Sequence, residues 1–135
     1  MVMAQELRMD LRLAEPLPFT VADGTAITKG TILALTDPRT AIAASSQGQM
    51  LAGIAARDKV ASDGRTELAV YRKGWFTANA SGAISVGQPV AATGVNNEVI
   101  LALTTYSGAQ ILGHALETAS DNEDILIEVN IGGAS

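Results

Sequence analysis

The chain has 135 residues with a formal net charge of −5 at pH 7, and 47% of them are hydrophobic, which suits one domain with a substantial core. It contains no cysteine and a single histidine, His114, which excludes disulfides, thiolate zinc sites, a cysteine nucleophile and multi-histidine metal sites. Only five residues are aromatic and the charge balance is acidic, so we expect no nucleic-acid partner.

The charges are divided unevenly along the chain. All nine Lys and Arg residues lie at or before Lys73, together with eight acidic residues, whereas six acidic residues and no basic ones follow. The two halves are therefore predicted to differ in polarity wherever separate surfaces display them, although drift in surface composition would give the same pattern. No stretch approaches the length of a membrane span, and five charges in the first 15 residues leave no room for a signal peptide. We expect a soluble protein made in the host cytoplasm, without a membrane partner.

The chain opens with an extended arm and proline linker, predicted over residues 1–18. Its alternating apolar residues are Leu7, Met9, Leu11 and Leu13. A period of two is typical of a strand with one apolar face, and the prolines of 15–18 favour an extended backbone. Two interpretations remain open: the arm reaches onto a neighbouring molecule, or it forms the first strand of the domain's own sheet.

Residues 19–135 are predicted to form a single β domain of short strands separated by turns. The predicted strands are 31–35, 41–44, 50–56, 66–71, 75–77, 89–92, 99–103, 111–116 and 125–131. Turn residues such as Asp23-Gly24 and Ser62-Asp63-Gly64 lie between them, and no long pattern of period 3.6 is present. The pattern indicates an all-β fold, a compact barrel or sandwich, although 111–118 is also compatible with a helix.

The domain is predicted to consist of two similar β units, at about 25–76 and 82–133. Residues 25–35 align with 82–92, and 51–55 align with 111–115. Leu68 and Val70 then match Ile127 and Val129, an offset of 59 residues. Each half is too short to bury an adequate core alone, so we expect the two units to share one. Coincidence in a chain rich in alanine and glycine is the alternative.

Candidate chemical groups are few. His114 aligns with Ile54 of the first unit, which favours a core or interface histidine over a catalytic base. The acidic run 121–124 supplies oxygen ligands for calcium but lacks the spaced pattern of a calcium loop, so a solvated turn is favoured. No enzyme signature is present, and we expect no catalytic residue, no bound metal and no cofactor.

Two neighbouring aromatic residues are the best candidates for contacts with a partner. Trp75 and Phe76 are consecutive in a predicted strand, so their side chains point to opposite faces. One should lie in the core and the other be exposed as an anchor. Together with His114 they form the candidate interface residues. The preceding basic pair, Arg72 and Lys73, is a weak nucleic-acid signal because acidic residues offset its basic neighbours.

Three segments carry a resemblance to a known family. AITKGTILAL at 26–35, LAGIA at 51–55 and ELAVYRKGWF at 67–76 resemble small tailed-phage proteins encoded beside capsid genes, the head decoration or cement proteins. The resemblance implies a β-rich homotrimer on the outside of the expanded capsid, with no catalytic residues. Its partner would be the major capsid protein, and capsid contact through an N-terminal segment would correspond to Leu7, Met9, Leu11 and Leu13.

The resemblance predicts a cement protein that binds the outer surface of the mature head, stabilises it by bridging capsid subunits and resides in the virion. The acidic half, 74–135, would then face outward. A tail or fibre component that binds glycans is an alternative, which five aromatic residues support poorly. A small trimeric β-fold hydrolase would need acidic residues at a subunit boundary, and only 121–124 clusters them. An ordinary adaptor domain is a third alternative.

Overall fold

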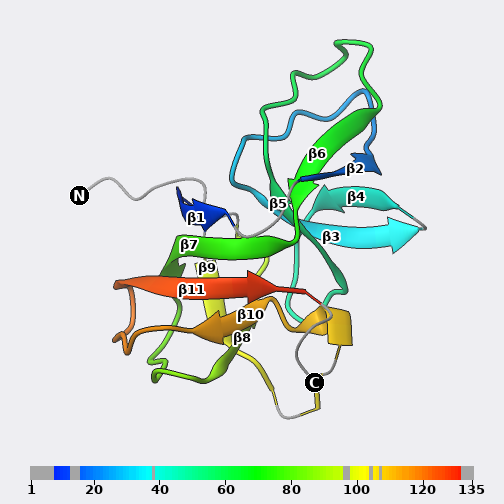
Figure 1. Ribbon diagram of the computed structural model, residues 1–135. Coiled ribbons are helices and arrows are strands. Elements are labelled where there is room, and N and C mark those ends of the chain that lie inside the picture. Colours follow the sequence, from blue (N-terminus) through cyan, green and yellow to red (C-terminus); the bar gives the residue numbers. More distant parts are fainter. Residues whose placement is uncertain are drawn as a thin grey trace.

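The computed structural model describes residues 8–12, 16–37, 39–95, 98–103, 105–106 and 108–131, and this part of the chain is all-β, as predicted (Figure 1). The strands are β1 (Arg8–Arg12), β2 (Leu17–Thr20), β3 (Ile32–Asp37), β4 (Thr40–Ala43), β5 (Leu51–Ala55), β6 (Glu67–Tyr71), β7 (Lys73–Ala80), β8 (Pro89–Ala92), β9 (Glu98–Leu101), β10 (Gly113–Ala115) and β11 (Asp124–Asn130). One turn of 3₁₀ helix, η1 (Gly108–Gln110), precedes β10. Among the described residues no helix is long and apolar enough to cross a membrane.

The strands form two five-stranded barrels with the same pairing scheme. The first unit, residues 17–71, closes in the order β2-β4-β3-β5-β6. The second unit, residues 73–131, is a sheet in the order β7-β11-β10-β8-β9, and the pairing of β7 with β9 closes it. Each barrel contains one parallel contact, β2 with β4 and β7 with β9, and its other pairings are antiparallel. This duplication confirms the predicted pair of similar β units.

The boundary between the units falls at Arg72, so β7 opens the second unit. The expected bounds, 25–76 and 82–133, instead begin each unit after its first strand. Two of the three predicted sequence matches agree with the strand pairing, but the third is wrong by two residues. Ala55 pairs with Val70 and Ala115 pairs with Ile127, so Val70 corresponds to Ile127 rather than to Val129. An alternating strand looks the same after a shift of two, which explains the error.

Two glycines let neighbouring strands approach closely at equivalent places in the barrels. Gly53 in β5 has a φ of +150°, and a Cβ there would collide with the carbonyl oxygen of Tyr71. Gly113 in β10 faces the carbonyl oxygen of Glu128 in the same way. A side chain would push β6 or β11 away, so both units need glycine at this position.

The larger of the hydrophobic clusters crosses the boundary between the units. The interior of the first barrel contains Phe19, Val21, Leu33, Leu68 and Val70. The larger cluster fills the second barrel and continues onto the outer face of β3 and β5 in the first unit, where Ile32 and Ile54 lie. The larger cluster is therefore shared by the two units, as expected from the sequence.

The proline-rich segment before the domain differs from the prediction. Residues 15–18 were expected to be an extended linker, but Leu17 and Pro18 already belong to β2, which pairs with β6. Proline lacks an N–H group, so a strand accommodates it only at a position where no such donor is needed, as in the short strand β2. The β domain thus begins at Leu17 instead of residue 19.

Candidate functional site

Strand β1 places the expected N-terminal arm against the second unit of the same chain. It pairs antiparallel with β7, with Met9 opposite Phe76 and Leu11 opposite Trp75. The structure describes Met9 and Leu11 through this backbone pairing, whereas Leu7 and Leu13 lie outside the described residues. Of the two sequence interpretations, this arrangement is the strand within the chain's own sheet. As the terminal strand in the order β1-β7-β11, β1 has one edge that no other described strand pairs with.

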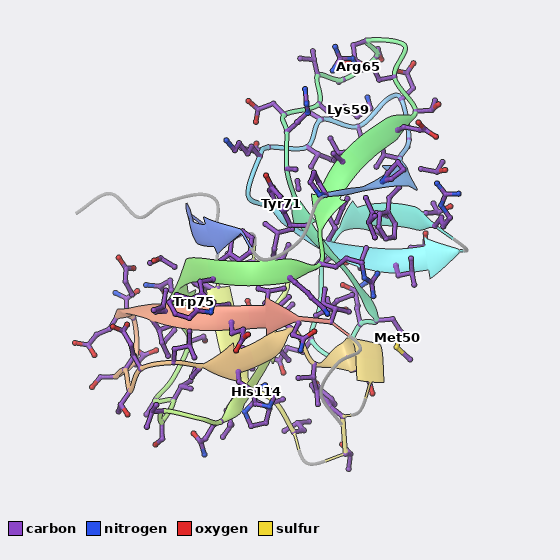
Figure 2. All side chains as sticks on the ribbon, viewed as in Figure 1. Met50, Lys59, Arg65, Tyr71, Trp75 and His114 are labelled. Carbon is purple, nitrogen blue, oxygen red and sulfur yellow. The ribbon has the colours of Figure 1, made fainter. Side chains whose placement is uncertain are left out.

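The neighbouring aromatic residues of β7 point to opposite sides of the second barrel. Phe76 is 1% exposed and belongs to the larger core, where the centroid of its ring lies 6.2 Å from that of the Tyr71 ring. Trp75 is 37% exposed on the outer face (Figure 2). The structure therefore assigns Phe76 to the core, which removes it from the candidate contact residues, and leaves Trp75 available to a partner.

His114 lies on the same outer face as Trp75. Across the sheet, Trp75 of β7 pairs with Glu128 of β11, Glu128 pairs with His114 of β10, and His114 pairs with Pro89 of β8. Paired residues project from the same side of a sheet, so these four side chains form one row. All four are partly or largely exposed. The histidine therefore belongs to the outer surface of the barrel.

The acidic turn before β11 is held by hydrogen bonds to the backbone. The carboxylate of Asp121 accepts a 2.7 Å hydrogen bond from the Gly82 N–H, and that of Glu123 accepts one from the Ser120 N–H at 2.7 Å. Asn122 between them adopts the left-handed conformation, with a φ of +68°. No group of three or more His, Cys, Asp or Glu residues within the described ranges has the arrangement of a metal site. Two of these carboxylates thus shape a turn, the interpretation that the sequence favoured.

The equivalent turn of the first unit contains a buried lysine. The side chain of Lys59 is 1% exposed, and its Nζ donates to the carbonyl oxygens of Asp23 at 2.7 Å and Val60 at 3.1 Å. A third hydrogen bond, 3.3 Å long, goes to Oδ1 of Asp63. All three ammonium protons are therefore satisfied. In the second unit Ala119 occupies the corresponding position, as the matching bridges Ile27–Lys59 and Ile84–Ala119 show.

Charge separates the two units, as the sequence predicted, but the first is neutral rather than basic. Residues 17–71 contain five basic and five acidic residues, whereas residues 73–131 contain Lys73 and six acidic residues. The net charge is thus 0 for the first unit and −5 for the second. Such an asymmetry biases how two copies approach each other, because two second units repel.

The described surface thus offers an unpaired strand edge at β1, an exposed tryptophan and a charge asymmetry between the units, features that can serve contact with a partner. Comparison with known families agrees. The profile of the family described as "Phage cement protein" matches residues 14–131, which includes both barrels. The chain therefore belongs to the phage cement protein family and is a structural component associated with the phage capsid. A search of curated proteins found no match.

Proposed function

We propose that the protein is a capsid cement protein that binds the outer surface of the mature head and stabilises it by bridging capsid subunits. We further propose that it acts as a homotrimer, without catalytic activity, cofactor, nucleic acid or membrane. The observation that carries the proposal is the family match, which extends over 14–131 and thus over the whole duplicated body. The glycan-binding and hydrolase alternatives are not proposed, because the family is one of structural capsid proteins.

Strand β1 is the proposed means of attachment. Its inner edge pairs with β7, and its outer edge has no partner among the described strands. An edge strand offers a row of N–H and C=O groups to which another chain can add a strand. An exposed strand of the capsid protein would extend the sheet at β1, with affinity from main-chain hydrogen bonds. Three copies would add avidity, so that each contact can be weak while the assembly holds.

Trp75 is the proposed anchor beside this strand. It lies directly opposite Leu11 of β1 and projects from the outer face of the barrel. A large aromatic side chain that loses its remaining exposed surface on binding contributes more to affinity than the polar residues around it. This attachment places the β1 side of the second unit against the shell, so only the rest of the acidic half, 74–135, would face outward.

Stabilisation of the head follows from selective binding. A site composed of neighbouring capsid subunits exists in full only on the expanded lattice. A protein that binds this lattice and not its precursor shifts the equilibrium towards it, by an amount that grows with the ratio of its concentration to its dissociation constant. The packaged DNA presses outward, and a bridge across subunits opposes their separation.

Sedimentation with purified shells tests the proposal. Capsids of the phage, stripped of this protein, are prepared in expanded and unexpanded forms and mixed with the purified full chain. We expect saturable co-sedimentation with expanded shells and a higher melting temperature of those shells. Equal binding to both forms, or to neither, would contradict the proposal. Val60→Asp changes an exposed residue of the first unit outside the proposed attachment surface. This variant serves as a control and should bind as the wild type does.

A further inference from the structure

The two units contact each other through a surface of the first unit, and the equivalent surface of the second unit has no such contact within the chain. The outer face of β3, β4 and β5 in the first unit corresponds to the outer face of β8, β9 and β10 in the second. The registers agree: Ile32 pairs with Ile54 in the first unit, and Pro89 pairs with His114 in the second. We call these the first face and the second face.

The centre of the first face is buried by the second unit, whereas Ile42 of β4, which pairs with Ala34 on this face, is 40% exposed. Ile32 and Ile54 are 0% exposed, and both belong to the core cluster that includes the interior of the second barrel. Tyr71, which pairs with Ile54 across the sheet, places its ring against Phe76 of the second unit. The second barrel therefore receives the first face near Phe76.

The second face is only partly covered. Its centre, Ala91 and Ile111, is buried beneath Tyr106 from the long connection between β9 and β10. Pro89 and His114 nevertheless remain half-exposed, although they occupy the positions of two fully buried isoleucines. Figure 2 shows His114 on the side of the second barrel that points away from the first unit.

Exposed apolar residues adjoin this uncovered part. Ile100, which pairs with Ala91 on this face, is half-exposed, and Leu103 just beyond β9 is exposed. A sheet face that combines such apolar residues with proline and histidine is apolar enough to be buried in an assembly. It is also polar enough for the free chain to remain in solution.

The first unit has a free counterpart of the surface that receives the first face. Leu17 pairs with Val70 as Phe76 pairs with Ile127, so Leu17 occupies in the first barrel the position of Phe76 in the second. Unlike Phe76, Leu17 is 49% exposed. In a second copy of the chain, the exposed surface around Leu17 is therefore equivalent to the surface around Phe76 on which the first face packs.

The charges beside the two surfaces are complementary. Glu128 pairs with His114 on the second face. Nη2 of the exposed Arg39 lies 3.4 Å from the carbonyl oxygen of Pro18, next to Leu17. A contact between the second unit of one copy and the first unit of another brings opposite charges together. A contact between two second units would instead join two bodies of net charge −5.

We propose that the second face, around Pro89 and His114, docks on the first unit of another copy at Leu17, repeating between molecules the contact that joins the two units within one. The proposal deepens the self-association invoked in the proposed function and rests on it. The contact is head-to-tail, because the two surfaces differ. If it closes at three copies, six units form a ring with three contacts inside chains and three between them.

Cysteine cross-linking tests the pairing directly, since the wild-type chain has no cysteine. Leu17→Cys and His114→Cys are made singly and together and treated with a short bis-maleimide. Each single variant alone should remain uncross-linked, a mixture of the two should give covalent dimers, and the double variant should give trimers. Dimers from His114→Cys alone would reveal a symmetric contact of second faces and would overturn the proposal.

Mass measurement provides a second test with charged variants. By light scattering, the wild type should have three times the 13.9 kDa chain mass. His114→Glu and Leu17→Asp should each raise the dissociation constant of the assembly about a hundredfold, because each places an uncompensated charge in the contact. Val60→Asp is the control and should leave the mass unchanged. Circular dichroism confirms that each variant is folded, and retention of the wild-type mass by both folded variants would contradict the inference.

Shell binding separates this inference from the proposed function. A wild-type chain that is monomeric in solution, but loses capsid binding in His114→Glu, would show that the capsid protein covers the second face, and would overturn the inference alone. A chain that forms the cross-linked trimer yet does not sediment with expanded shells would overturn the proposed function alone.

Discussion

Nζ of Lys59 lies 3.3 Å from Oδ1 of Asp63 in a turn whose counterpart in the second unit has Ala119 in place of the lysine. Asp63 also accepts a 2.9 Å hydrogen bond from the Arg65 N–H, and the neighbouring Asp23 accepts one from the Gly64 N–H at 2.7 Å. The lysine thus joins two segments that are 36 residues apart in sequence. The second unit has alanine at the corresponding position, so a turn of this kind forms without the ion pairs.

Lys59→Ala is expected to lower the free energy of unfolding by about 1–3 kcal/mol, because two carbonyl groups and a carboxylate lose a charged donor in a partly buried site. Urea unfolding at neutral pH measures the change. The matched control is Lys29→Ala, which removes an exposed lysine of the same unit and should change stability by less than about 0.5 kcal/mol. Equal effects of the two substitutions would show that the buried lysine adds nothing specific.

Asp63 should make the first unit sensitive to acid. The hydrogen bond from the Arg65 N–H, aided by Lys59 and opposed by burial, lowers the pKa of the Asp63 carboxyl below its usual value. A lowered native pKa stabilises the fold above the unfolded value of about 4, and this stabilisation is lost as the pH falls through the native pKa. Asp63→Asn should therefore reduce the difference in unfolding free energy between pH 7 and pH 3, measured by urea titration. A variant that retains the full wild-type difference would exclude this role.

Gly53→Ala should be among the most damaging single substitutions in the first unit. It combines a φ of +150° with a Cβ that would overlap the Tyr71 carbonyl oxygen. We expect a loss of more than about 4 kcal/mol, a large share of the stability of a small domain. Gly87→Ala is the control, since Gly87 has a φ of +86° but open space around it, and should cost about 1–2 kcal/mol. Thermal unfolding of both variants separates close approach from backbone strain alone.

Much of this architecture could be predicted from local patterns. Short alternating runs and turn residues located most of the strands, and the Gly53 and Gly113 motifs aligned correctly because glycine is required by close backbone approach rather than by composition. The opposite orientations of Trp75 and Phe76 follow from the pleat of a strand alone. Which of them would be buried does not, because both are large aromatic residues.

Long-range pairing was beyond local reasoning. β2 was missed because Pro16 and Pro18 indicate a linker, and its partner β6 lies about 50 residues away in the sequence. The partner of the arm could not be deduced either, since any exposed strand edge offers the same backbone groups. Ile54 is apolar and buried, whereas the equivalent His114 is polar and partly exposed. The difference in burial arises because the second unit covers Ile54 and no unit of the same chain covers His114.

Trp75 and Phe76 give a matched pair for separating binding from stability. Phe76→Ala should lower the free energy of unfolding by about 3–5 kcal/mol, because it leaves a cavity in the core shared by the units. Trp75→Ala should cost only about 1 kcal/mol, since it removes outer-face contacts. For binding to expanded shells the order should reverse. Folded Trp75→Ala should bind at least about tenfold more weakly than the wild type, because an aromatic anchor is lost. Phe76→Ala, assayed at a temperature where it is folded, should bind with near-normal affinity. If Trp75→Ala binds normally, attachment depends on the backbone of β1 and the outer face of β7 plays no part.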